Sequence, residues 1–404
     1  MTRFIAGASA LALLLALSPA QASDAAHAER VHRAALVIDA HADLPAPYDF
    51  GPGWPAANAA DQVTPALLRA GGVDAVFLSV FVPQGENSPE RIDAARREAE
   101  AKLAYVNQRI AADPARLRLA RSADEIAQIA GQGRTAVLIG VLNAYPLANA
   151  ADLGAFYDRG VRVIGFTHAG NNRFADSSRP QPRDGGRSVG GLSPEGEALV
   201  AEANRLGVLL DVSQLSTPAF LEAVALSTAP VIATHSGVKG VVNSPRNLSD
   251  AELDALKAKG GVVGIVAFSS YLKPVPATAQ AEIAAARARY GAVNGYEGLS
   301  AERRAALSAE IRALTPQADV GDLVTSIDYA VRRIGIDHVA ISSDFNHGGG
   351  VEGWRNAGQA RAVTRALLER GYSQADIAKL WGGNVLRVLR AAERAAPARV
   401  ALAR

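Results

Sequence analysis

Cysteine is absent from the 404 residues of this sequence, which excludes disulfide bonds, thiolate metal sites and a cysteine nucleophile. A surplus of either charge is absent too, because 42 Lys and Arg residues stand against 40 Asp and Glu residues, for a net charge of +2. That balance, without any cluster of basic residues, argues against nucleic acid as a partner. The lack of thiols suits a protein that works in an oxidising compartment.

Apolar stretches long enough to cross a membrane are also missing. The apolar run over residues 4–17 has about 14 residues, whereas a spanning helix needs about 20. A positive charge precedes the run and the small-residue sequence Ala20-Gln21-Ala22 follows it, which is the pattern of a cleavable secretory signal. We therefore predict a signal peptide over residues 1–22, export to the periplasm, and a mature chain without a transmembrane segment. An uncleaved N-terminal anchor is the alternative.

A regular alternation of short apolar runs and longer segments of helical period extends from residue 34 to residue 390. Continuous apolar strands separated by helices are typical of a parallel sheet covered on both faces. Eight such runs predict an α/β fold, the (β/α)8 TIM-type barrel. An open doubly wound sheet is the alternative, but it lacks a G-x-G-x-x-G sequence after its first strand. The predicted strands span residues 35–40, 73–82, 136–142, 162–167, 207–212, 230–234, 262–268 and 338–343.

Two segments depart from this alternation. Residues 273–333, between the seventh and eighth predicted strands, are rich in Ala, Arg and Glu and predict an inserted helical excursion. Residues 391–404 have no clear periodicity, so we predict a frayed tail after a single barrel domain over residues 34–390. The sequence does not determine the oligomeric state, and a homodimer is compatible with it.

Polar residues follow several of the predicted strands, at the end of a barrel where catalytic groups collect. His41 and Asp43 lie two positions apart on the first strand, so both side chains face the same way and can converge on a divalent metal. A strand-end histidine beside a capping aspartate is the alternative. His235 adds a second imidazole after the sixth strand, and this addition favours the metal.

Other polar residues at these strand ends have two interpretations each. His168 and Asp344 are candidates for catalysis, with Asp344 as a proton shuttle beside a metal; the alternative is that they brace the barrel mouth. Arg246 is a candidate to clamp a substrate carboxylate, or else it pairs with Asp250. His347 and the three glycines after it predict a flexible loop over the mouth.

Seven segments carry a resemblance to a known family, and they occur in its order and spacing. They resemble the membrane (renal) dipeptidase family of zinc peptidases, in its exported bacterial branch, over essentially all of residues 34–390. The fold of that family is a (β/α)8 barrel, in agreement with the strand count. The segments are VIDAHADLP (37–45), GVRVIGFTHAGNNRFADSS (160–178), GGLSPEGEALVAEANRLGVLLDVSQLS (190–216), APVIATHSG (229–237), PRNLSD (245–250), ISSDF (341–345) and LWGGNVLRVL (380–389).

The resemblance implies an exported, metal-dependent dipeptidase that cleaves short peptides, including dipeptides with a C-terminal D-residue, by a zinc-activated water. It implies one or two zinc ions, whose ligands are His41, Asp43 and His235, with Gln214 at a further ligand position. It also implies that Asp344 and His168 are catalytic. The implied substrate-binding residues are Arg246, which grips the C-terminal carboxylate, His168 and Tyr145.

Two residues depart from the family pattern. Leu142 lies where the family has a glutamate that bridges two metals, and Gln214 lies where the family has a histidine ligand. A leucine cannot ligate, and an amide is a poorer zinc ligand than an imidazole. Two adjacent divalent ions need bridging negative charge to offset their repulsion. We therefore predict an impaired dinuclear centre.

These departures leave a second function open. The chain is then a dipeptidase relative that binds or tailors a peptide during periplasmic maturation of a peptidic metabolite such as a siderophore. The segment HGGGVEGW (347–354) resembles relatives of that kind. A purely structural or adhesion module is a third possibility, but it would not explain polar residues directed at one barrel mouth.

Overall fold

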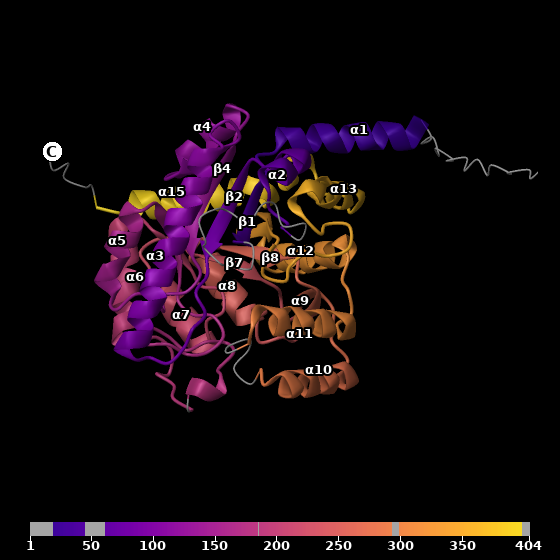
Figure 1. The fold of residues 1–404 in the computed structure, drawn as a ribbon. Helices are drawn as coiled ribbons and strands as arrows, with labels where there is room; N and C mark the ends of the chain where they lie inside the picture. The colour runs from indigo at the N-terminus through magenta and orange to yellow at the C-terminus, as the bar shows by residue number, and fades with distance from the viewer. Residues whose placement is uncertain (1–18, 45–60, 185, 293–298, 398–404) are drawn as a thin grey trace, which may run out of the picture.

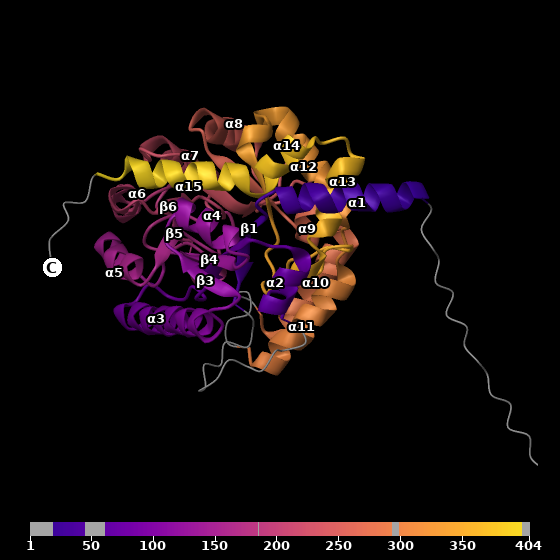
Figure 2. The ribbon, with the colours of Figure 1, turned by 90° about the horizontal axis from the view of Figure 1, so that it is seen from above.

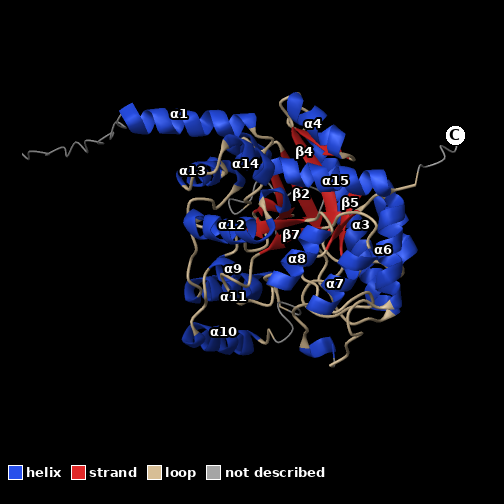
Figure 3. Cartoon of the chain, turned by 180° about the vertical axis from the view of Figure 1, so that it is seen from behind, coloured by secondary structure: helices blue, strands red, loops and turns tan. Residues whose placement is uncertain are grey.

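The computed structural model describes residues 19–44, 61–184, 186–292 and 299–397. Most of the predicted signal peptide, residues 1–18, lies outside this range. Within it, nine strands form one sheet surrounded by helices (Figures 1 and 3). The strands are β1 (Ile38–Asp43), β2 (Ala75–Val80), β3 (Leu117–Ala120), β4 (Thr135–Val141), β5 (Val161–Gly165), β6 (Leu209–Asp211), β7 (Ile232–Ser236), β8 (Val262–Val266) and β9 (Val339–Ser342).

The sheet is parallel and nearly closed into a TIM-type barrel, as Figure 2 shows from above. Its order is β1-β2-β4-β5-β6-β7-β8-β9, with β3 paired to the first half of β4. The residues after β9 return to β1: the backbone N–H of Asp344 donates to the carbonyl of His41 at 3.0 Å, and that of Asp43 donates to the carbonyl of Phe345 at 2.9 Å. These two bonds join the first and last strands of the barrel.

All eight predicted strands are confirmed, because each apolar run supplies a strand that is buried on both faces. Every residue of β4, β5 and β8 is buried, for example. The sequence pattern does not predict β3. Between its buried ends, Arg118 is exposed and Leu119 is half-buried, so this four-residue strand has no continuous apolar run.

The helices that cover the barrel begin and end at residues suited to these positions. Ser193, for example, accepts a hydrogen bond from the backbone N–H of Gly196 at 3.1 Å, and Gly207 ends the same helix with a left-handed φ of 71°. These helices are α2 (Pro65–Gly71), α3 (Pro89–Ala112), α4 (Ala123–Gly131), α5 (Leu153–Asp158), α6 (Pro194–Leu206), α7 (Thr217–Leu226), α8 (Asp250–Ala258), α9 (Ser269–Leu272), α12 (Val320–Ile334), α13 (Arg361–Glu369), α14 (Gln374–Ala378) and α15 (Asn384–Ala395).

The predicted insertion before the last strand is a pair of helices, α10 (Ala277–Tyr290) and α11 (Ala301–Leu314). They pack on each other through a small apolar cluster of their own that includes Ala286 and Leu307. The pair follows the C-terminal end of β8 and lies at the opposite end of the molecule from α1 (Pro19–Ala34), as Figures 1 and 3 show. None of the helices in the described part of the chain is both long and apolar enough to cross a membrane.

Helix α15 corrects the prediction of a frayed tail from residue 391. The helix continues through Ala395, and Ala392 is buried in the apolar core. The amphipathic pattern of residues 384–395 continues past residue 391, and its buried face, which includes Val385, Val388, Leu389 and Ala392, holds the helix on the barrel. Residues 398–404 of the predicted tail lie outside the described range.

The free energy of unfolding depends on the protonation state of Asp74, which lies directly before β2. Its carboxylate accepts a hydrogen bond from the backbone N–H of Val37 at 2.8 Å, and burial raises the pKa of this carboxyl to about 6. Because this pKa lies above that of an unfolded aspartate, the folded state binds the proton more tightly. Ionisation therefore destabilises the fold above pH 6 by up to about 3 kcal/mol, and this cost disappears as the pH falls from about 6 to about 4.

We expect Asp74→Asn to raise the free energy of unfolding at pH 7.5, because the amide keeps an oxygen for the Val37 N–H and carries no charge. Urea denaturation should show a gain that shrinks toward pH 4. The same substitution at Asp93, an exposed residue of α3, is the control and should change little at either pH. A gain of equal size at both pH values would contradict the assignment.

Candidate metal centre

The end of β1 and the residues after β9 place one histidine and two carboxylates together at the barrel mouth. His41 and Asp43 are two positions apart on β1, and Asp344 is held beside them by the backbone bonds that close the barrel. Nε2 of His41 lies 3.9 Å from Oδ2 of Asp43 and 3.8 Å from Oδ1 of Asp344. The predicted convergence of His41 and Asp43 is thus present, and Asp344 joins them.

The atoms of this group that face one another lack hydrogen bonds. Among the described residues, Nε2 of His41 and Oδ1 of Asp43 have no hydrogen-bond partner, although both side chains are fully buried, and Oδ2 of Asp43 has a charged contact with Nδ1 of His347 at 2.8 Å. Buried polar atoms are normally satisfied, so an unsatisfied set needs a reason. An imidazole nitrogen and carboxylate oxygens within 4.8 Å of one another suit a divalent cation such as zinc. The residues present therefore fit one metal ion at this position.

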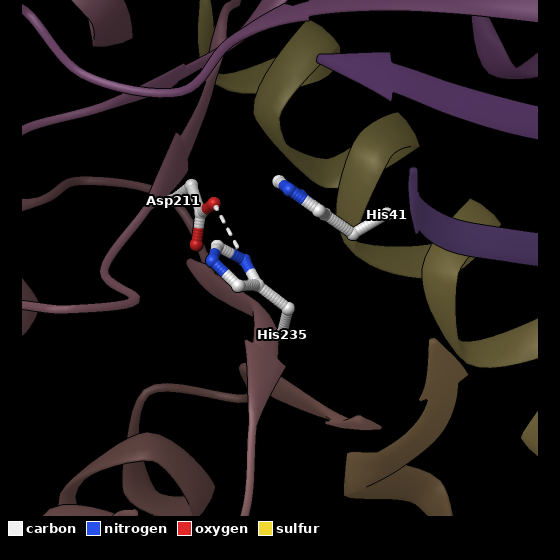
Figure 4. A group of neighbouring side chains, drawn as sticks. All are labelled: His41, Asp211 and His235. Carbon is white, nitrogen blue, oxygen red and sulfur yellow. Dashed lines mark ion pairs between the residues drawn. The ribbon is translucent and has the colours of Figure 1, made fainter. Parts of the chain in front are cut away.

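The hydroxyl of Thr234 determines how both histidines are oriented. It donates to Oδ2 of Asp211 at 2.6 Å, so it must accept from Nδ1 of His41 at 3.0 Å and from Nδ1 of His235 at 2.8 Å. Both imidazoles then carry their proton on Nδ1 and present the Nε2 lone pair to the mouth. The two rings stack at 3.8 Å, and Figure 4 shows Asp211 beside His235.

A second group that could hold a cation consists of His41, Asp211 and His235, but its ligand atoms are already in use. Oδ1 of Asp211 accepts from the backbone N–H groups of Ser213 at 2.9 Å and Thr234 at 3.0 Å, and Oδ2 accepts from the hydroxyl of Thr234. The group is a satisfied hydrogen-bond network that orients the histidines. The structure thus brings His235 next to His41, as predicted, while the unsatisfied atoms lie on the side of Asp43.

The surroundings of His235 do not fit a second metal ion. Its Nε2 lies 2.9 Å from Nε2 of Gln214, whose Oε1 accepts from Nη2 of Arg179 at 2.6 Å. Leu142 is buried and offers no ligand atom. Two divalent ions about 4 Å apart repel by about 16 kcal/mol at an effective dielectric constant of 20, and nothing in this set supplies a bridging charge. The predicted impairment of a dinuclear centre agrees with these contacts.

His168 and His347 cover the centre together with Phe81. The ring of His168 lies 4.6 Å from that of Phe81 and 5.1 Å from that of His347. Burial, with the nearby charge of Arg179, lowers the pKa of His168 well below its usual value, so this imidazole is neutral. Nδ1 of His347 lies 2.8 Å from Oδ2 of Asp43. Burial lowers the pKa of His347, but the adjacent carboxylate outweighs it and raises this pKa overall.

Arg246 lies between β7 and α8 and is 3% exposed. Its Nη2 donates to the carbonyl of His235 at 2.9 Å, and its guanidinium lies 5.3 Å from the centre of the Tyr271 ring. Among the described residues, Nε and Nη1 have no hydrogen-bond partner. The alternative partner, Asp250, instead accepts from the hydroxyl of Tyr329 at 2.7 Å. Arg246 therefore keeps donors for a ligand, as the carboxylate clamp requires.

The loop after β9 is held by backbone hydrogen bonds, and its predicted flexibility stays a prediction. Gly349 donates to the carbonyl of Asp344 at 2.9 Å, and Gly350 donates to the carbonyl of Ala267 at 2.7 Å. A Cβ atom at Gly349 would lie 2.1 Å from the carbonyl oxygen of Ser343, so this glycine permits a close approach of two chain segments. The glycine run thus fixes His347 over the centre.

Backbone strain is concentrated at the same place. Gln214, Asp344 and Asn346 have φ values of 70°, 56° and 66°, and they are the residues other than glycine with positive φ in the described part of the chain. Such conformations cost about 1–3 kcal/mol each and persist where the surrounding structure enforces them, as in functional sites.

Tyr145 packs differently from the other candidates. It is 2% exposed within the apolar core, and its hydroxyl donates to the backbone carbonyl of Glu86 at 2.7 Å. Burial of this tyrosine is thus explained by packing, and its role in substrate binding stays a prediction.

Two residues of the centre are not indicated by the sequence pattern. Thr234 lies inside β7, one position before His235. The alternation of side chains along the strand does not predict that this threonine would contact the histidines. Arg179 lies in an irregular segment between β5 and α6. The only signal for Arg179 is its place directly after the segment that ends in FADSS (174–178), within a polar stretch.

A nearly closed parallel barrel with a buried His–Asp–Asp group at its mouth is typical of the metal-dependent hydrolases built on the TIM fold. A model of the membrane dipeptidase family (peptidase family M19) matches residues 25–401. The chain belongs to this family, whose members are metallopeptidases, and it is a hydrolase.

Similar proteins carry dipeptidase names. A solved structure, the probable dipeptidase PvdM from Pseudomonas aeruginosa, is 35% identical with a TM-score of 0.83, and the match covers 93% of this chain and 100% of that chain. Dipeptidase verJ of Clonostachys rogersoniana is 32% identical over 81% of this chain and 74% of its own length. Dipeptidase tcpJ of Claviceps purpurea is 29% identical over 84% of this chain and 71% of its own length.

Proposed function

We propose that the protein is an exported metal-dependent dipeptidase that binds a short peptide by its C-terminal carboxylate. The observation that carries this proposal is the buried convergence of His41 Nε2, which lacks a hydrogen-bond partner among the described residues, with the carboxylates of Asp43 and Asp344. This set lies at the strand ends where barrel enzymes have their active sites. Zinc is the ion that we propose, because an imidazole nitrogen and carboxylate oxygens are among its usual ligands.

Each side chain has a distinct part in the proposed reaction. A divalent ion held by His41 and Asp43 supplies water activation and polarisation of the peptide carbonyl when it is bound. Asp344, 3.8 Å from His41 Nε2, takes a proton from the attacking water and returns it to the leaving amine. Neutral His168 donates an N–H to the scissile carbonyl, and Arg246 holds the carboxylate. A C-terminal D-residue stays part of the proposal because the family resemblance implies it.

Export rests on the N-terminal signal sequence, and the packing of α1 supports it. The described residues by which α1 contacts the barrel lie after the predicted cleavage site at Ala22. Val31 is buried in the core, and His32 donates or accepts at Thr364 Oγ1 (2.6 Å) and at the carbonyl of Gly71 (2.8 Å). The mature N-terminus that we propose is Ser23, in the periplasm.

Two observations favour a second function. Leu142 offers no ligand atom, and Nε2 of His235 already accepts a hydrogen bond from Gln214. A centre without a full metal complement is suited to hold a peptide without cleaving it, in the maturation of a peptidic metabolite. In that case Arg246 and His168 serve binding alone.

Hydrolysis of simple dipeptides by protein purified from the periplasm separates the two functions. We expect Zn²⁺-dependent cleavage of L-Ala-L-Ala and L-Ala-D-Ala that a chelator abolishes and added Zn²⁺ restores, with an intact mass that begins at Ser23. Tight binding of dipeptides by zinc-loaded protein without turnover, measured by calorimetry, would favour the second function instead.

A further inference from the structure

The hydrogen bonds around Gln214 can be made in only one direction. Its amide NH2 faces the Nε2 lone pair of His235, and its oxygen faces the guanidinium of Arg179. With the amide turned round, oxygen would meet a lone pair and the NH2 would meet a donor, so both bonds would be lost. The lone pair of His235 that could bind a metal is therefore occupied, and the chain of bonds ends in a positive charge.

Arg179 is held firmly in this position. The backbone N–H of Ser178 donates to the carbonyl of Gln214 at 2.8 Å, so the segment that carries the arginine is attached to the residue that it contacts. Gln214 itself has a left-handed φ of 70°, which directs its side chain and is costly for a residue other than glycine. Neighbouring chain segments thus enforce the contact between Arg179 and Gln214.

The guanidinium of Arg179 carries its charge without local neutralisation. No carboxylate of the described residues lies within ion-pair distance of it, and its Nε is buried without a hydrogen-bond partner. A buried cation without a counter-charge repels any other cation nearby. The two carboxylates of the centre, Asp43 and Asp344, lie within 3.9 Å of Nε2 of His41, and no ion pair joins either of them to Arg179.

We propose that the centre holds one divalent cation, at His41 and Asp43, and that Arg179, acting through Gln214, replaces the second cation and prevents it from binding. Leu142 is consistent with this arrangement, because a carboxylate that bridges two cations has no function when the second positive charge belongs to the protein. The inference rests on the proposed function for the first cation, and it assigns Arg179 as a positioning residue that keeps Gln214 on His235.

Metal stoichiometry tests this inference without reference to activity. Equilibrium dialysis against Zn²⁺, followed by elemental analysis, should give one ion per wild-type chain. The variant Leu142→Glu/Gln214→His regains ligand atoms but keeps Arg179, so we expect its second ion to bind at least tenfold more weakly than in the triple variant that adds Arg179→Gln. Urea denaturation of each variant establishes that it is folded.

A matched control replaces a neighbouring arginine. Arg183 lies in the same segment and donates to the carbonyl of Ala169, so Leu142→Glu/Gln214→His with Arg183→Gln should bind the second ion as weakly as the double variant. Two tightly bound ions in the wild type, or equal second-site affinity in both triple variants, would overturn the inference and leave the proposed function standing. Wild-type protein that binds no zinc would overturn the proposed function itself.

Discussion

Replacement of Asp43 by asparagine is expected to abolish tight metal binding and to lower dipeptide hydrolysis by at least about 10³-fold. Both oxygens of this carboxylate are buried and have no hydrogen-bond partner among the described residues. Apart from the contact of Oδ2 with Nδ1 of His347 at 2.8 Å, they are available to an ion. Asparagine has the same shape but lacks the charge and one of the two oxygens.

Thermal unfolding distinguishes this role from a structural one. Zinc should raise the Tm of the wild type through its preference for the folded state, whereas the Tm of Asp43→Asn should not respond to zinc. The variant without metal should remain folded, with a Tm lowered by the loss of the contact between Asp43 and His347. Asp74→Asn, a neutralised buried carboxylate away from the centre, should keep both the metal response and the activity. A zinc-dependent rise in Tm for Asp43→Asn would contradict the assignment.

Arg246→Gln is expected to lower kcat/KM for dipeptides with a free carboxylate by about 10²-fold or more, the loss for a buried, charge-assisted contact of about 3 kcal/mol. Two nitrogens of this guanidinium, Nε and Nη1, lack partners among the described residues, while Nη2 is held by the carbonyl of His235. The bond to that carbonyl fixes the position of the guanidinium. Nε and Nη1 remain able to donate hydrogen bonds to the carboxylate of a substrate.

The matched substrate with a C-terminal amide shows whether the lost contact involves the carboxylate. The wild type should cleave the dipeptide far faster than its amide, and Arg246→Gln should cleave both at similar low rates. A variant that loses the same factor on both substrates would show that Arg246 supports the site without contacting the carboxylate. Zinc content should be one ion per chain in either case.

The strands could be predicted because a strand that is buried on both faces is apolar at consecutive positions in the sequence. A run such as that of β4 is apolar at every position, since both faces of a covered parallel strand are buried. β3 gives no such signal, because a short strand beside half of β4 exposes Arg118. The pair His41 and Asp43 was equally predictable, since a spacing of two on a strand places both side chains on one face.

The hydrogen bonds of the centre could not be predicted from the sequence. The contact of Arg179 with Gln214 joins segments 35 positions apart, and the hydroxyl of Thr234 reaches His41 across 193 positions. These pairings depend on strand register around a closed barrel and on left-handed backbone at Gln214. Sequence identified Gln214 as a missing ligand, whereas the structure identifies it as the link between an imidazole and an arginine.

Barrel closure has a consequence for how the metal is acquired. The ligands on β1 are among the first residues of the barrel to be synthesised, and Asp344 follows them by about 300 positions. The backbone bonds that bring Asp344 to His41 are the same bonds that complete the ring of strands. The site that combines His41 and Asp43 with Asp344 is consequently complete only once the barrel has closed.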